Sequence, residues 1–280
     1  MILWIASYPK SGNTWIRALV STYMYSDERK FNFDLLDRIP KFVQEKYFSP
    51  FIKLEELKKK PLKIVEYWHA AQSRINLANR AMFFKTHNAC AAYGDKWFTD
   101  ETNTIGYIYV VRDPRAVVCS LAYHSSISLE KATAEVLNEK FIGYNGPYKL
   151  AELPGSWKIN YLSWKKKKNF EGIIIKYEDL IDNTEREFKK ILFYLKKIFK
   201  TSGYDESCFS NDENKILEII NSCQFSNLRK MEETHGFKEA TYNKFFRMGQ
   251  KDNWKKELSS DLRRKIEVNF KKEMLELGYL

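Results

Sequence analysis

The opening 25 residues constrain the fold more than any other stretch of this 280-residue chain. An apolar run, Ile2–Ala6, predicts a short buried strand, and the loop YPKSGN follows it almost directly. Apolar residues at helical spacing then predict a helix over 14–25, which one of the polar residues Ser11, Asn13 and Thr14 would cap. A strand, a glycine-bearing loop and a helix in this order point backbone N–H groups and a helix dipole at an anion.

Strands and helices alternate along the rest of the chain. Each predicted strand ends where polar or charged residues begin, at Lys85 to His87, at Arg112 and at Tyr177. In a parallel sheet these ends lie along one edge, where open α/β folds bind ligands. We therefore expect an α/β fold in a single domain over 1–280, with a central, mostly parallel sheet flanked by helices and with helical lid insertions. The further strands are predicted at 81–87, 104–112 and 172–176, and helices at 54–60, 64–80, 113–124, 129–141, 180–200 and 258–277.

Composition narrows the classes of partner. The net charge of +11 would attract anions. The lysine runs 58–60 and 165–168 are typical of solvated faces, and no element interleaves arginine with aromatic residues, so a nucleic-acid partner is not expected. The cysteines and histidines show no metal-site or disulfide spacing, so we expect no metal and reduced thiols. The first apolar run is too short for a signal peptide and no stretch reaches about 18 apolar residues, so a cytoplasmic protein without a transmembrane segment is expected.

The order of residues in the first loop excludes a Walker A motif. GxxxxGK[ST] places its lysine after the second glycine, whereas Lys10 precedes Gly12. The segment YPKSGNTW at 8–15 instead resembles the 5′-phosphosulfate-binding loop of the sulfotransferases that use 3′-phosphoadenosine 5′-phosphosulfate (PAPS) and release 3′-phosphoadenosine 5′-phosphate (PAP). The resemblance implies a P-loop-like three-layer fold. It also implies that the co-substrate is held by Lys10, Ser11, Gly12, Asn13, Thr14 and Trp15.

Two later segments resemble the family's 3′-phosphate site. YVVRDPRAVVCS at 109–120 implies that Arg112 and Ser120 hold that phosphate, and a guanidinium suits the task because it forms bidentate, charge-assisted hydrogen bonds. FFRMGQKDNW at 245–254 resembles the C-terminal segment in which an Arg-Lys-Gly triplet completes the site. Here the triplet is Arg247-Met248-Gly249, so one lysine is missing and Lys251 is the nearest replacement.

Aromatic residues at three positions resemble the family's adenine contacts. Trp15 and Phe225 correspond to the tryptophan and phenylalanine between which the base stacks, and such stacking contributes about 1 to 3 kcal/mol per base. Tyr177, in KYEDL, resembles the tyrosine that contacts the edge of the base.

The segment FFKTHNA at 83–89 resembles the family's Lys-Thr-His motif. It implies that His87 is the general base, since an imidazole that titrates near pH 6.5 suits this work at neutral pH. Lys85 would lie near the sulfuryl oxygens and Lys10 on the bridging oxygen, with Ser120 holding Lys10 until the donor is complete. Because these lysines supply the positive charge that the transferred group needs, the resemblance implies no metal.

The acceptor stays open. Aromatic residues outside the motifs suggest a pocket with flat apolar walls, which suits a phenol, a lipid or a sugar face equally well. The hydroxyl or amine that is sulfated therefore belongs to a small-molecule, lipid or glycan acceptor. These aromatic residues are Tyr67, Trp68, Tyr123, Tyr144 and Trp157.

Two other functions compete with this interpretation. A P-loop kinase for a small metabolite would use ATP and magnesium, and a non-catalytic anion-binding protein would use only the basic charge. The sequence also departs from the dimerisation motif Lys-x-x-x-Thr-Val-x-x-x-Glu of the cytosolic members, because Ser259, Ser260 and Arg264 stand at its last three defined positions. The oligomeric state therefore stays open.

Overall fold

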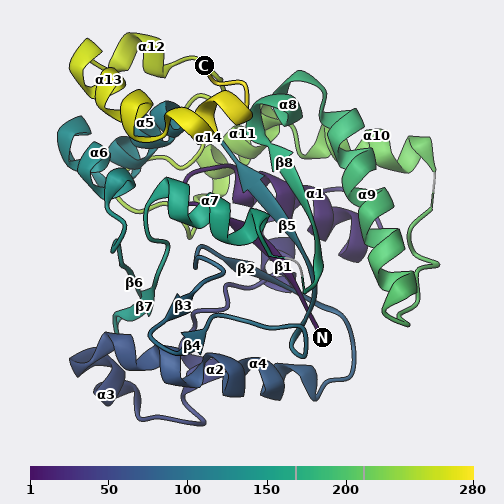
Figure 1. Ribbon diagram of the computed structural model, residues 1–280. Helices are drawn as coiled ribbons and strands as arrows, with labels where there is room; N and C mark the ends of the chain where they lie inside the picture. Colours follow the sequence, from purple (N-terminus) through teal and green to yellow (C-terminus); the bar gives the residue numbers. More distant parts are fainter. Residues whose placement is uncertain (168, 211) are drawn as a thin grey trace.

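The computed structural model describes residues 1–167, 169–210 and 212–280, so Lys168 of the second lysine run lies outside the described residues. At its centre is a sheet of four parallel strands in the order β2-β1-β5-β8, with helices on both faces (Figure 1). The predicted α/β fold with a central parallel sheet is confirmed, and each strand lies where an apolar run predicts it. The strands are β1 (Ile2–Ser7), β2 (Met82–Thr86), β5 (Thr104–Val111) and β8 (Glu171–Lys176).

Helices and two short hairpins surround this sheet. The hairpins are formed by β3 (Ala92–Tyr93) with β4 (Lys96–Trp97) and by β6 (Gly143–Asn145) with β7 (Leu150–Glu152). In the described part of the chain, no helix combines the length and apolar character needed to cross a membrane. The α-helices are α1 (Asn13–Tyr25), α2 (Glu45–Phe48), α3 (Leu54–Lys59), α4 (Trp68–Asn76), α5 (Pro114–Ser125), α6 (Leu129–Leu137), α7 (Trp157–Lys165), α8 (Tyr177–Asp182), α9 (Thr184–Thr201), α10 (Glu213–Ser222), α11 (Phe225–His235), α12 (Trp254–Glu257), α13 (Ser260–Asn269) and α14 (Lys271–Glu276).

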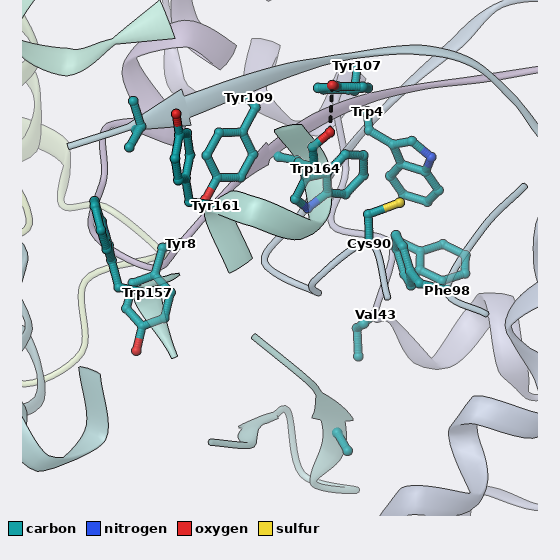
Figure 2. Close-up of a cluster of buried hydrophobic side chains, with 14 of the residues drawn as sticks. Trp4, Tyr8, Val43, Cys90, Phe98, Tyr107, Tyr109, Trp157, Tyr161 and Trp164 are labelled. Atoms are coloured by element: carbon teal, nitrogen blue, oxygen red, sulfur yellow. Dashed lines mark hydrogen bonds between the residues drawn. The ribbon is translucent and has the colours of Figure 1, made fainter. Parts of the chain in front are cut away.

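The side chains of β1 alternate between two cores, one on each face of the sheet. Leu3 and Ile5 pack with apolar residues of α1 and α9. Trp4 faces the other side, in an aromatic cluster built from β5 and α7, where the Tyr107 hydroxyl donates to the Trp164 carbonyl at 2.7 Å (Figure 2). Burial on both faces explains why β1 and β5 read as continuous apolar runs.

Several predicted helices end earlier than expected or are divided. The predicted helix 64–80 is a 3₁₀ helix, Pro61–Tyr67, followed by α4, and the helix predicted to run to 141 ends at Leu137. Asn183, at φ −152° and ψ 81°, separates α8 from α9 and accepts the Arg186 N–H on its side chain. The helix predicted over 258–277 is divided in the same way, into α13 and α14, at Phe270 (φ −115°, ψ 18°). At Asn183 and Phe270 a residue with non-helical angles divides a helix that the apolar spacing predicts as continuous.

Candidate active site

A cavity of about 350 Å³ lies at the carboxyl edge of the sheet. The segments that follow all four strands contribute to its wall, as parallel strands require. The C-terminal segment and α5 close its other sides. The predicted site residues that line it are Lys10, Gly12, Asn13, Thr14, Trp15, Lys85, His87, Arg112, Ser120, Tyr177, Phe225, Arg247, Met248 and Gly249, and Ser11 is fully buried beside them.

Gly12 shapes the loop after β1. Its φ of +103° lies in the left-handed region, and a Cβ there would stand 2.5 Å from the Tyr177 ring. Gly12 is the cap residue of α1 and has no side chain to bond the first turn, so the predicted caps Ser11, Asn13 and Thr14 are wrong. Asn13 instead donates to the carbonyl of Ile5 at 2.9 Å, which ties the loop back to β1. In the first turn of α1 the Trp15 N–H donates to the Gly12 carbonyl at 3.0 Å, and in the described chain the N–H groups of Asn13 and Thr14 have no such backbone partner. These two groups can therefore bind an anion in the cavity.

Three polar atoms at this loop are buried without a hydrogen-bond partner in the described part of the chain. They are Ser11 Oγ, Asn13 Oδ1 and Arg112 Nε. Arg112 is otherwise held in place, because its Nη1 donates to the Lys10 carbonyl at 3.2 Å and its guanidinium lies 4.4 Å from the centre of the Tyr177 ring. Buried polar atoms are nearly always paired, so these atoms indicate a ligand that supplies partners.

Of the two predicted lysines, Lys85 is buried and Lys10 is half-buried, and both lose their charge more easily than an exposed lysine. The ammonium of Lys10 lies 3.8 Å from the centre of the Phe245 ring, and burial, helped by the charge of Lys85, lowers the pKa of Lys10 to about 7. Burial also lowers the pKa of Lys85, to about 8, although Lys85 pairs with Glu239 at 2.9 Å. A dianionic ligand would restore full charge to both lysines, because an opposite charge favours the protonated ammonium.

Glu239 is a site residue that the sequence analysis missed. It bridges Lys85 and the buried Arg17, whose Nη1 lies 2.7 Å from Glu239 Oε1. Burial alone would raise the pKa of Glu239, but the charges of Lys85, Arg17 and Lys41 outweigh burial and hold it well below its usual value. The sequence around Glu239, GFKEATYN, has no periodicity or motif that marks it.

His87 is oriented by hydrogen bonds of its ring and of its backbone. Its Nδ1 lies 2.8 Å from the Ser7 carbonyl, and because a carbonyl only accepts, Nδ1 carries the proton and Nε2 keeps a free lone pair. Its backbone N–H donates to Glu152 at 2.6 Å, and its carbonyl accepts from Asn160 at 2.9 Å. Burial lowers the pKa of His87 to about 4, so the ordinary value near 6.5 expected from the sequence is wrong, and the ring is neutral at physiological pH.

Aromatic faces line the end of the cavity near α11. Trp15 is fixed by its Nε1, which donates to the Cys223 carbonyl at 2.9 Å, and it meets Tyr177 edge-on at 6.0 Å. The backbone of Gly249 lies on the face of Phe225, where a Cβ would stand 2.5 Å from the ring. Trp15 and Phe225 thus line the same cavity from segments about 210 residues apart, as the predicted adenine site requires.

The C-terminal triplet reaches the same cavity. Arg247 pairs with Glu257 at 3.0 Å and stacks on Tyr123, and Met248 is 42% exposed. Lys251, which the sequence suggests as a substitute for the missing lysine, pairs with Asp182 and lines a different hollow, so this substitution is not supported.

The predicted aromatic wall for an acceptor is largely wrong. Of its five residues, Tyr144 lines the cavity, whereas Trp68 and Trp157 belong to the core. Lys41, Asn145 and Glu152 line the same cavity as Tyr144, and sequence reasoning missed these three residues. Lys41 is placed by pairing of its backbone segment with Lys85, a tertiary contact that no local pattern indicates.

The chain matches one family model along most of its length. A model described as "Sulfotransferase domain" matches residues 2–278. The chain is 26% identical to Sulfotransferase 1B1 of Canis lupus familiaris over 277 residues, covering 96% of this chain and 82% of that protein. It is 25% identical to a flavonol sulfotransferase-like protein of Flaveria bidentis over 280 residues, covering 95% of this chain and 79% of that protein.

Solved structures share the fold. Mouse sulfotransferase SULT7A1 complexed with PAP superposes with a TM-score of 0.57 at 18% identity, covering 98% of this chain and 84% of that one. Retinol dehydratase in complex with androsterone and the inactive cofactor PAP gives a TM-score of 0.59 at 14% identity, covering 98% of this chain and 80% of that one.

Proposed function

Because the chain belongs to the sulfotransferase domain family, it is a sulfotransferase, and we propose that it moves the sulfuryl group of PAPS to a hydroxyl or amine of a small-molecule, lipid or glycan acceptor. One observation carries the proposal: Lys10, Arg112 and Arg247 come from distant segments and line one cavity together with His87. PAP, the product left after transfer from PAPS, is present in the two similar structures.

The chain's own residues suit the two charged ends of this donor. Ser11 Oγ and Arg112 Nε are buried without partners among the described residues, and phosphate oxygens would satisfy both. Lys10 and the uncapped first turn of α1 would hold the 5′ end, and Arg112, Ser120 and Arg247 the 3′-phosphate. Trp15 and Phe225 would stack on the adenine, with Tyr177 at its edge.

The transfer needs a base and a field of positive charge. The donor supplies a sulfuryl group whose bond to the bridging phosphate oxygen breaks as a bond forms to the acceptor oxygen or nitrogen. His87 Nε2 takes the acceptor's proton, and Ser7 stabilises the resulting imidazolium through Nδ1. Lys10 neutralises the charge that develops on the leaving phosphate, and Lys85 that on the sulfuryl oxygens.

The competing functions have a direct test. The family match does not favour a magnesium-dependent kinase or a non-catalytic anion-binding protein. We expect calorimetry to show that PAP binds at least about tenfold more tightly than ATP, with or without magnesium, since only PAP offers a 3′-phosphate to Arg112. Magnesium-dependent preference for ATP would contradict the proposal. Mass spectrometry of a cell extract incubated with enzyme and labelled PAPS would then identify sulfated products.

We also propose that the protein works in the cytoplasm. All four cysteines are free thiols, and Cys90, Cys119 and Cys223 are buried. Reduced thiols are typical of that compartment. Fractionation of the source cells, with immunodetection of the chain, tests this location.

Restoring the missing lysine of the triplet should strengthen nucleotide binding. Met248 lines the cavity between Arg247 and Gly249, so Met248→Lys adds a cation beside the 3′-phosphate site. We expect PAP to bind about fivefold more tightly, equal to about 1 kcal/mol, and the gain to shrink in high salt. Calorimetry at two ionic strengths measures it, with the neutral Met248→Gln as the control. An equal gain in the control would refute the electrostatic reason.

The affinity for PAP should fall as the pH rises above 7. Lys10 has a pKa of about 7 in the free protein, and an anion binds its protonated form, so binding takes up a proton at higher pH. We expect the dissociation constant to rise at least about fivefold from pH 7 to 9. In Lys10→Arg, whose guanidinium stays charged, the rise should be smaller. Calorimetry in buffers of different ionisation enthalpy would count the protons, and equal pH dependence in both proteins would contradict this origin.

A further inference from the structure

We propose that the acceptor is an elongated, hydroxyl-rich molecule of the saccharide class, an inference that rests on the proposed function. It follows from the half of the cavity beyond His87, away from the nucleotide residues. In that half the charged and amide side chains of Lys41, Asn145 and Glu152 stand beside Phe141, Tyr144 and Pro154.

Glu152 is the strongest evidence. One carboxylate oxygen accepts the His87 N–H at 2.6 Å and the other accepts from Asn145 at 3.3 Å, which fixes the group beside the base. No lysine or arginine of the described chain pairs with it within 4.0 Å. An apolar acceptor would remove water from this charge without replacing its hydrogen bonds, which is costly.

Lys41 places an opposite charge on the same wall. Its backbone is fixed by pairing with the Lys85 strand end, where Lys85 N–H donates to the Pro40 carbonyl at 2.8 Å. A hydroxyl both donates and accepts, so neighbouring hydroxyls of one molecule can donate to Glu152 and accept from Lys41. In a phenol or a steroid alcohol the single hydroxyl is the group that reacts. The hydrocarbon of such an acceptor would bury the charges of Glu152 and Lys41 without hydrogen bonds to replace water.

The cavity also continues beyond these residues, which indicates an acceptor of some length. Lys41 and Asn145 line both the cavity and an open groove of about 420 Å³. The groove lies between the start of α2 and the β6–β7 hairpin, and its wall carries the polar side chains of Gln44, Glu45 and Lys46 beside Val43 and Leu150. A chain whose reacting hydroxyl is at His87 would extend along this groove.

The aromatic residues of this half are consistent with a sugar. Tyr144, on β6, is 57% exposed, and both Tyr144 and Phe141, which precedes that strand, line the cavity. One aromatic face beside hydrogen-bonding groups suits the apolar side of a sugar ring, whose other edges carry hydroxyls.

A direct comparison of acceptors tests the class. With saturating PAPS, kcat/KM would be measured for glucose and N-acetylglucosamine, for their β-linked and α-linked di- and tetrasaccharides, and for 4-nitrophenol, a hydroxysteroid and tyramine. We expect at least one saccharide series to be sulfated, with kcat/KM rising at least about tenfold from monomer to tetramer as the groove fills. Calorimetric titration of the preferred tetrasaccharide into the PAP complex should show binding. Higher kcat/KM for the phenol, steroid or amine than for every saccharide would overturn the inference.

Groove variants test the placement. In Gln44→Ala and Lys46→Ala, the ratio of tetrasaccharide to monosaccharide kcat/KM should fall about fivefold, while the exposed Lys53→Ala, outside the groove, keeps the wild-type ratio. An unchanged ratio in both groove variants would overturn the placement. Binding of PAP distinguishes failure of the proposed function from failure of the saccharide inference. If PAP does not bind, the proposed function fails. If PAP binds and no saccharide of the panel is bound or sulfated, only the saccharide inference fails.

Discussion

Replacing His87 by alanine is expected to lower the rate of sulfuryl transfer by about 10²- to 10⁴-fold, while the dissociation constant of PAP changes less than about threefold. The reason is geometric. Nδ1–H is fixed on the Ser7 carbonyl, so Nε2 is the nitrogen that can take the acceptor's proton, and the residues proposed to hold the nucleotide are others. Rates measured with labelled PAPS and affinities measured by calorimetry provide the two numbers.

The pH profile gives the His87 prediction a second test. Because burial lowers the pKa of His87 to about 4, the base is neutral throughout the physiological range and the acid limb of transfer should lie near pH 4. An acid limb near 6.5 would contradict the buried, neutral base. The exposed His235→Ala serves as the matched control and should transfer at the wild-type rate. Wild-type rates in His87→Ala would eliminate base catalysis by this residue.

Replacing Lys10 by methionine is expected to lower kcat by about 10²- to 10³-fold, the usual effect of removing one preorganised group from a developing anion. PAP affinity should fall as well, because the proposed function also places Lys10 on the bound nucleotide before transfer. Thermal stability should be retained or should rise, because burial already disfavours the charged form of this lysine and methionine removes that cost. Steady-state kinetics and a thermal melt of the same preparation test both parts.

The Lys10 result has two controls. Lys10→Arg keeps the charge but not the compact ammonium, so it should retain nucleotide binding better than it retains kcat. The exposed Lys53→Met removes a lysine charge far from the cavity and should leave both constants at the wild-type values. If Lys10→Met transferred sulfate normally, the leaving group would have to be neutralised elsewhere, and the role assigned to the first loop would be wrong.

The parts of the site that sequence could predict are those in which function depends on local geometry. The loop with Lys10 and Gly12 joins a strand to a helix within a few residues, so its sequence alone predicts its local structure. Arg112 follows a buried strand directly, and Asp113 caps the helix after it, α5, by accepting the Arg115 N–H at 2.9 Å. These features require no knowledge of how distant segments meet.

The residues that sequence reasoning missed are placed by distant contacts. Glu239 lies in an irregular segment and reaches the site only because Arg17 and Lys85 hold it. Lys41 and Glu152 are brought beside His87 by a strand-end pairing and by a hydrogen bond to a backbone N–H. The acceptor wall was mispredicted for a related reason. A large aromatic side chain can line a pocket or pack in the core, and Trp68 and Trp157 pack in the core.

The buried ionic cluster of Arg17, Glu239 and Lys85 constrains the evolution of this sequence. Loss of one partner from a buried ionic group typically costs about 3 to 5 kcal/mol, whereas joint replacement by apolar residues is often neutral. Because the three come from α1, β2 and the loop after α11, a mutation at one position alters the fitness of mutations at the other two. We therefore expect homologues to inherit or lose the three charges as a set, a pattern of covariation that would link the opening and the closing thirds of the sequence.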